Sequence, residues 1–154
     1  MAANTPSQVA RELSRLIAGE IEVRDFPWLS NYERRALGAL GMSMLKAGKF
    51  EVAMAAFRVL IDLEPDIAVH HLMSGHSAVL ADDVPGAFSH FGRAIALSSQ
   101  DERNRDVAAE AFLARGDLLL RIGRTVEARA DLADALVRLT DPVRRRSIEV
   151  FLAS

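Results

Sequence analysis

The sequence predicts an all-α protein made of stacked helical hairpins, and three observations support this. Between Leu37 and Pro65, apolar residues recur with the spacing i, i+3, i+4, i+7, which places them on one face of a helix. Gly48 interrupts the pattern, and glycine readily adopts the left-handed conformation in which helices end. The same arrangement returns twice further along the chain. We therefore expect repeated helix pairs, because one hairpin cannot bury its remaining faces alone.

The first hairpin defines the repeated pattern. Its two helices would pack through Leu40, Gly41, Met44, Ala53, Phe57 and Leu60. We expect Gly41 to face Ala53, so that the two backbones approach closely, while Phe57 fills the space beside them. A second copy lies 34 residues further on, at Ser74, Gly75, Ala78, Ala87, Phe91 and Ala94. The third copy comprises Gly116, Leu119, Gly123, Ala128, Leu132 and Ala135.

This period and this pattern of small and aromatic residues resemble the tetratricopeptide repeat (TPR), over about residues 31–140. The resemblance implies a right-handed superhelix of three TPR-like helical hairpins. The sequence departs from the repeat pattern at Ser74, Asp82, Ser99, Arg115 and Leu132. Seven residues are also inserted near 98–106, and we expect them to form a loop or, preferably, an extension of the following helix. We expect the third repeat to be weakened most.

The chain length suits a single all-α domain, 1–154, of about eight helices. We expect an N-terminal helix and connector at 1–30, the three repeats at 31–140, and a C-terminal capping helix at 141–154. Within the repeats, the expected helices span 31–47, 49–63, 66–81, 84–97, 107–122 and 125–139. The N-terminal helix would carry an apolar stripe of Val9, Leu13, Leu16 and Ile17. This stripe must dock, either on the first repeat or on a second copy in a homodimer.

A binding groove is predicted on the concave side, which the first helices of stacked hairpins line. Beside its packing face, each of these helices carries a second row that is mostly apolar, which is typical of a groove for a hydrophobic peptide segment. The predicted lining residues are Arg35, Met42, Leu45, Val69, Leu72, His76, Val79, Leu80, Leu113, Asp117, Leu120 and Arg121. In the alternative arrangement, the N-terminal or the last helix fills this groove.

The resemblance narrows the expected partner. TPR proteins that clamp a C-terminal carboxylate use Lys, Arg and Asn on this face, where the present chain has Gly38, Met42 and Leu72. In layout, the chain is similar to the small cytosolic chaperones of bacterial type III secretion. That resemblance implies a bacterial, cytoplasmic chaperone that binds a secreted partner before export, and it leaves open a homodimer contact through about residues 7–19. The alternative function is a structural or assembly adaptor that binds a folded partner through its convex face or its ends.

The sequence gives no indication of catalysis, a cofactor or a metal. It contains no cysteine and no nucleophile elbow, phosphate-binding loop or metalloprotease motif. The four histidines, His70, His71, His76 and His90, lack the spacing of metal ligands on a helix. A formal charge of −2 gives no reason to expect nucleic acid, and no apolar run is long enough to span a membrane. The basic run at 144–146 is expected to be a solvated helix face.

Overall fold

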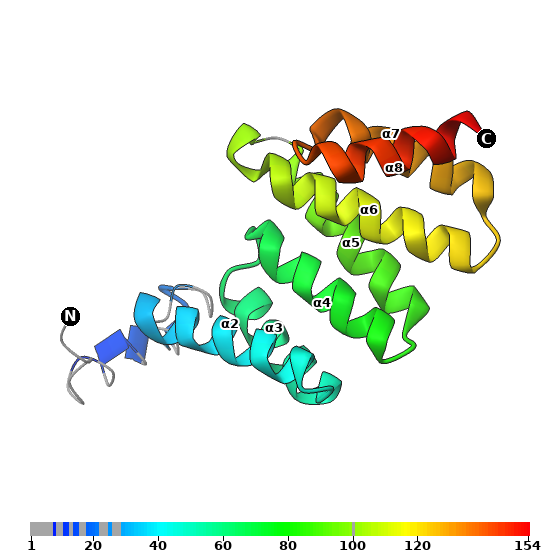
Figure 1. Ribbon diagram of the computed structural model, residues 1–154. Helices are drawn as coiled ribbons and strands as arrows, with labels where there is room; N and C mark the ends of the chain where they lie inside the picture. Colours follow the sequence, from blue (N-terminus) through cyan, green and yellow to red (C-terminus); the bar gives the residue numbers. More distant parts are fainter. Residues whose placement is uncertain are drawn as a thin grey trace.

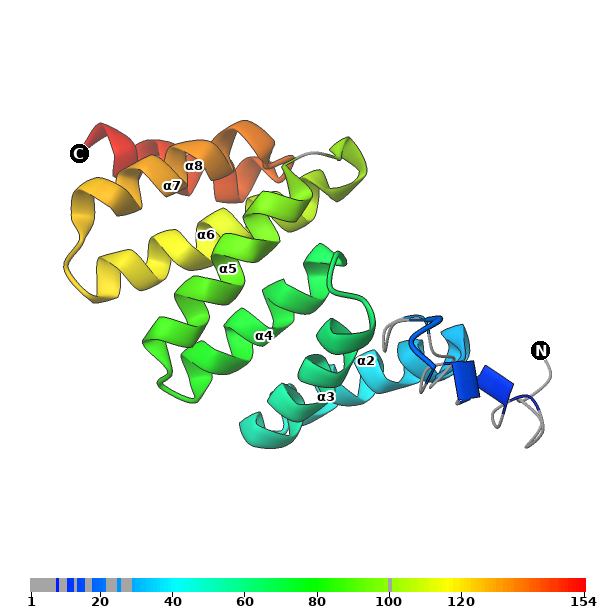
Figure 2. The same ribbon diagram turned by 180° about the vertical axis from the view of Figure 1, so that it is seen from behind.

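A computed structural model describes residues 8, 11–12, 14–15, 18–21, 25, 29–99 and 101–154. Residues 29–99 and 101–154 form seven α-helices and one short 3-10 helix, and none of the described residues is in a strand. The helices form two layers, with α2, α4, α6 and α8 in one layer and α3, α5 and α7 in the other (Figure 1 and, from behind, Figure 2). None of the described helices is both long and apolar enough to cross a membrane.

Three hairpins follow one another along the chain. They are α2 (Asn31–Lys46) with α3 (Phe50–Leu63), α4 (Ala68–Leu80) with α5 (Val84–Ser98), and α6 (Arg105–Arg121) with α7 (Thr125–Arg138). A 3-10 helix, η2 (Glu102–Asn104), precedes α6, and α8 (Pro142–Ala153) packs against α7. The predicted all-α class, the hairpin order and the helix boundaries are confirmed, with the ends within about two residues of those expected.

The N-terminal segment is only partly described. Helical conformation is present at Gln8, Arg11, Glu12, Ser14 and Arg15. The predicted apolar stripe of this helix lies outside the described residues. Its docking on the first repeat and its role in a homodimer therefore stay predictions.

The helix ends follow from local sequence. Ser30 and Glu33 form a capping box at the start of α2, with the Ser30 amide donating to Glu33 Oε2 at 2.7 Å. Asp83 caps α5 by accepting from the Gly86 amide at 3.0 Å. Gly48 ends the first turn with a φ of 74°, and Asp82 occupies the same left-handed region with a φ of 61°. Aspartate tolerates this region better than most residues, so the turn survives without glycine.

In each hairpin, a glycine of the first helix lies against an aromatic or leucine side chain of the second. A Cβ added at Gly41 would lie 2.8 Å from Phe57 Cζ, and one at Gly75 would lie 2.4 Å from Phe91 Cε1. In the third hairpin, a Cβ at Gly116 would lie 3.1 Å from Leu132 Cγ. The Phe57 ring thus lies directly over Gly41, and in the third hairpin the backbone oxygen of Ala128 also lies close to the added Cβ at Gly116, at 3.5 Å. The alanines remain essential to the packing, since Ala53, Ala87 and Ala128 are fully buried.

The third hairpin replaces an apolar contact by an ion pair. Arg115 Nε and Nη2 each donate to a carboxylate oxygen of Asp131 at 2.7 Å. Asp131 is only 6% exposed, and its hydrogen bonds raise the pKa of Arg115. Bidentate pairs of this kind are short, directional and strong. Arg115, which departs from the repeat pattern, therefore joins α6 to α7 through a specific ion pair.

Arginines also satisfy the carbonyl groups at the end of α7. Arg105, in the inserted segment, donates to Val137 O at 2.9 Å and to Arg138 O at 3.1 Å. Arg145 donates to Leu136 O at 2.6 Å and to Leu139 O at 3.0 Å. The last carbonyls of a helix have no partner within it and attract cations. The insertion thus forms η2 and the first turn of α6, so the expected helical extension is confirmed in part.

The basic run at 144–146 is largely solvated, as expected, and two of its arginines also make specific contacts. Arg144 pairs with Glu110 of α6, with Nη2 and Oε2 3.1 Å apart. Arg145 caps α7, as described above. The side chain of Arg146 alone is mainly exposed, at 78%.

The glycine contacts predict how strongly replacement of each glycine by alanine destabilises the protein. Gly75→Ala should lower the free energy of unfolding by about 1–3 kcal/mol, because the added methyl group meets the Phe91 ring in a packed core. Gly116→Ala should have a smaller effect, because its nearest neighbour is further away. Gly38→Ala is the matched control: its Cβ would meet Leu60 Cδ1 at 3.7 Å, an ordinary contact. Urea unfolding measures all three, and a Gly75→Ala protein as stable as the wild type would contradict the packing described.

Candidate peptide-binding face

The candidate site is the surface that α2, α4 and α6 form on the side away from α3, α5 and α7, called the inner face below. These three helices lie side by side, and neighbouring members contact each other (Figure 1). Because each turns its glycine-bearing side to its own hairpin partner, the adjacent row of each helix is directed to the inner face. This is the row that the sequence predicted as a groove.

Helix α4, the middle helix of the inner face, exposes apolar side chains at its two ends. Val69 is 40% exposed and Leu80 is 52% exposed, both on α4. Met42 and Leu45 are half-buried against the core of the first hairpin, and Val79 is half-buried against the core of the second. The remaining surface offers exposed charged groups, at Arg35, Asp117 and Arg121. This region can provide apolar contacts flanked by charges.

Leu72 is a core residue and does not line the face. It is 3% exposed and belongs to a buried cluster with Phe91 and Ala111. Helix α4 contacts α3, α5 and α6. Because three helices surround it, the position of Leu72 is covered. Glutamate at this position would disrupt the fold and could not test binding.

The end of the inner face on α6 is shared with α8. Leu113 and Leu120 are half-buried against a cluster that includes Leu132 of α7 and Ile148 of α8. Phe151 and Leu152 of α8 pack against the same cluster. The last helix therefore covers part of the third repeat, as the alternative arrangement expected, while the apolar residues on α4 stay exposed.

His76 is in the centre of the predicted row and is half-buried. Its ring meets the edge of Phe91 with centroids 5.4 Å apart. Burial lowers the pKa of His76, and the nearby Glu110 carboxylate partly opposes this effect. Glu110 is itself paired with Arg144, so an ion pair links α6 to α8 at this end of the face.

A polar hollow of about 280 Å³ lies at the other end, where α2 meets the start of α4. Its lining residues are Asn31, Arg34, Arg35, Gly38, Glu64, Ile67 and His70. Glu64 accepts from Arg34 Nη1 at 2.9 Å and from His70 Nε2 at 3.0 Å. Of these residues, only Arg35 was a predicted lining residue of the groove. The Arg34–Glu64 pair was not predictable from a local pattern, because its partners are 30 residues apart.

The remaining histidines are structural. His71 is 7% exposed and its Nε2 donates to Pro65 O at 2.9 Å. Its ring lies 5.9 Å from that of His90 on α5. Burial lowers the pKa of both groups. The described part of the chain contains no group of three or more His, Asp or Glu side chains arranged to hold a metal ion.

The lowered pKa values of these histidines predict that the protein loses stability in mild acid. Their folded-state pKa values lie below the ordinary value, so between the two values the unfolded chain binds more protons. The free energy of unfolding should therefore decrease as the pH falls from 7 to 5.5, as measured by urea unfolding. Glu33 and Asp101, whose pKa values are lowered by hydrogen bonds, would act only below this window. His90→Gln should reduce the slope, and a stability independent of pH in this window would contradict the prediction.

Comparison with known proteins identifies similar chains. No family model matches the sequence. The bovine tetratricopeptide repeat protein 36 is 31% identical over 123 residues, which are 80% of this chain and 63% of the bovine protein. The chain therefore spans less than two thirds of the length of that relative.

Solved structures with 20–21% sequence identity resemble the fold. The first TPR domain of Spaghetti (RPAP3), bound to the HSP90 peptide SRMEEVD, gives a TM-score of 0.66 over 82% of this chain and 98% of that chain. PcrH in complex with the chaperone binding region of PopD gives 0.64 over 82% and 92%. The type III secretion translocator chaperone SycD of Yersinia enterocolitica gives 0.64 over 90% and 95%.

Proposed function

We propose, from the TPR-type fold that this chain has, that it is a non-enzymatic binding module that holds a hydrophobic segment of a partner protein on its inner face. The observation that carries this proposal is the exposure of Val69 and Leu80, at the two ends of the middle helix of that face. Exposed apolar surface marks interaction sites when it extends beyond single residues, and the half-buried Met42 and Leu45 add apolar surface on the neighbouring helix α2.

The energetics suit a short segment with several anchors. Burial of one Leu-sized side chain contributes about 1.5–3 kcal/mol. Three anchors, against Met42, Val69 and Leu80, would contribute about 4.5–9 kcal/mol before the cost of ordering the segment, so further contacts are needed to reach micromolar affinity. An extended strand or one short helix would bring three side chains to this row.

More specifically, we propose that the partner is a secreted protein. The chain would hold it in the bacterial cytoplasm before export, as a type III secretion chaperone does. Two of the similar structures support this proposal, since one is such a chaperone and another holds the chaperone binding region of PopD. A homodimer contact through about residues 7–19 belongs to the same proposal. Gly38 and Met42 on the inner face favour a hydrophobic segment over a carboxylate-terminated peptide such as SRMEEVD.

Two labelled peptides distinguish these chemistries by fluorescence anisotropy. A peptide covering the chaperone binding region of PopD should bind at least about tenfold more tightly than SRMEEVD. Val69→Glu and Leu80→Glu should each weaken that binding by about tenfold or more, because a carboxylate must then be buried against the segment. Val59→Glu is the matched control, since Val59 is 44% exposed on α3, in the other layer. Far-UV circular dichroism checks that all variants fold.

Tighter binding of SRMEEVD would contradict the proposal and indicate carboxylate recognition. Equal binding by wild type, Val69→Glu and Leu80→Glu would remove the inner face as the site.

The second candidate function is an adaptor that binds a folded partner through the outer surface. Val126 and Val137 on α7 favour it, since they are 83% and 68% exposed. If the protein is such an adaptor, Val126→Glu should weaken binding of the native partner, and Val69→Glu should not. The nature of the native partner also distinguishes the two functions. An aggregation-prone export substrate would favour the chaperone function, and a stable folded assembly would favour the adaptor function.

A further inference from the structure

One side of α2 is exposed, although the corresponding side is covered in α4 and in α6. It carries Ala36, Ala39, Leu40 and Ser43, which are all exposed, and Leu40 is 47% exposed. Their spacing of i, i+3, i+4, i+7 places the four residues on one stripe, called the end row of α2 below. The end row lies on a different side of α2 from Met42 and the inner face, because successive residues of a helix are about 100° apart.

The equivalent rows of α4 and α6, counted from the close-packing glycine of each helix, are buried or half-buried. They comprise His70, Met73, Ser74 and Ser77 on α4, and Ala111, Ala114, Arg115 and Leu118 on α6. Met73 packs against the buried cluster of α3. Ala111 and Leu118 lie in one cluster with Phe91 of α5. In both cases the second helix of the preceding hairpin covers the row (Figure 2). The end row of α2 is therefore built like the sites at which α4 and α6 receive a preceding helix.

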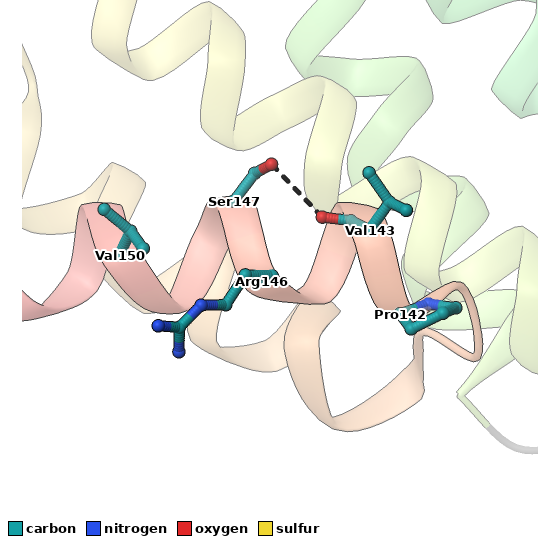
Figure 3. A pocket seen from close by; sticks show the side chains of 5 residues that line it. All are labelled: Pro142, Val143, Arg146, Ser147 and Val150. Carbon is teal, nitrogen blue, oxygen red and sulfur yellow. Dashed lines mark hydrogen bonds between the residues drawn. The ribbon is translucent and has the colours of Figure 1, made fainter.

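The opposite end of the array is built differently. Helix α8 exposes Val143 and Val150 beside a shallow hollow, where Ser147 Oγ donates to Val143 O at 3.2 Å (Figure 3). Val150 stands 34 residues after Gly116, so a valine takes the place of the glycine against which Leu132 of α7 packs. The C-terminal end thus departs from the repeat pattern, whereas the α2 end retains it.

The chain itself supplies a helix shortly before α2. The described residues between 8 and 15 are helical, the Ala18 amide donates to Ser14 O at 2.9 Å, and Gly19 follows with a φ of 73°. The apolar residues of this segment recur with the spacing i, i+4, i+7, i+8, at Val9, Leu13, Leu16 and Ile17. This spacing assigns them to one side of the helix. An isolated helix of this length is marginal in water, so its apolar side requires a surface to pack against.

We propose that residues 7–18 bind as a helix to the end row of α2 in their own chain, in the place that α3 takes on α4. The connecting residues 20–30 can span up to about 36 Å. Helix α2 has 16 residues and is about 24 Å long, so the segment can reach every part of the end row. Tethering raises the effective concentration of the segment to about the millimolar range, which favours its own chain over a second copy. Arg11 and Arg15 lie on the other, exposed side of the segment, which a contact between two copies would use.

This docking leaves the inner face open. A helix on the end row covers the side of α2 that lies away from Met42. The segment then covers the first hairpin at one end of the array, as α8 covers the third hairpin at the other end. Of the positions that the sequence allowed for the N-terminal helix, the geometry thus favours the first repeat over the groove.

Disulfide cross-linking tests the contact directly, because the natural chain contains no cysteine. In the full chain, Leu13→Cys is combined in turn with Ala39→Cys, Leu40→Cys and Ser43→Cys. The matched control combines Leu13→Cys with Met42→Cys, on the inner side of the same helix. A disulfide requires Cα atoms within about 7 Å, so at least one end-row pair should form a bond within one chain, at least about fivefold faster than the control pair. Non-reducing electrophoresis separates these monomers from cross-linked dimers.

Urea unfolding tests whether the contact stabilises the protein. Leu13→Ala and Leu40→Ala should each lower the midpoint by about 0.5 M or more, because each removes buried apolar surface. The double variant should lower it by clearly less than the sum, because the two side chains share one contact. Leu80→Ala is the matched control, since Leu80 is 52% exposed on α4, and it should change the midpoint by less than about 0.2 M.

Four results would overturn the proposal. A faster disulfide between the cysteines at 13 and 42 would place the segment on the inner face, and disulfides formed only between chains would assign it to a second copy. The absence of any cross-link to the end row, or a midpoint that Leu40→Ala does not lower, would leave the end row uncovered. These measurements use no peptide, so they are independent of whether the inner face binds a hydrophobic segment.

Discussion

The structure depends on three positions at which a helix carries no side chain, Gly41, Gly75 and Gly116. A Phe ring, or Leu132 in the third hairpin, occupies the space that a Cβ would need. Each pair of helices is therefore held at close range in one relative position, and the repeat of this contact aligns the first helices α2, α4 and α6 (Figure 2). The inner face is a consequence of this alignment. Its exposed apolar residues are those that remain after the glycine-bearing sides have been buried.

The sequence predicted the features that depend on local pattern and failed on those that depend on stacking. Helix boundaries follow from caps and turn residues such as Ser30 and Gly48, so they were predictable. The burial of Leu72 was not, because it arises from helices on both sides of α4. The Arg115–Asp131 pair was read from the sequence as a defect, since nothing in the pattern shows that an acid lies opposite. Of the predicted site, Val69 and Leu80 lie exposed on the inner face, whereas Leu113 and Leu120 partly serve the packing of α8.

The two ends of the repeat array differ in chemistry. At the α2 end, Glu64 joins Arg34 and His70 around a polar hollow that is open to solvent. At the other end, arginines fix α8 in place: Arg145 caps α7, and Arg129 of α7 caps α8 through the carbonyls of Phe151 and Leu152. The uncovered apolar residues of the inner face thus belong to the first two hairpins. The third hairpin uses its equivalent residues to hold α8.

The central claim is that the inner face receives a hydrophobic segment, and methyl NMR tests it most directly. In protein labelled at Met, Leu and Val methyl groups, addition of a peptide covering the chaperone binding region of PopD should shift Met42, Val69 and Leu80 most. Val52 and Val59 on α3 should keep their positions, because they lie in the other layer. Shifts confined to the outer valines, with the inner-face methyl groups unchanged, would contradict the account.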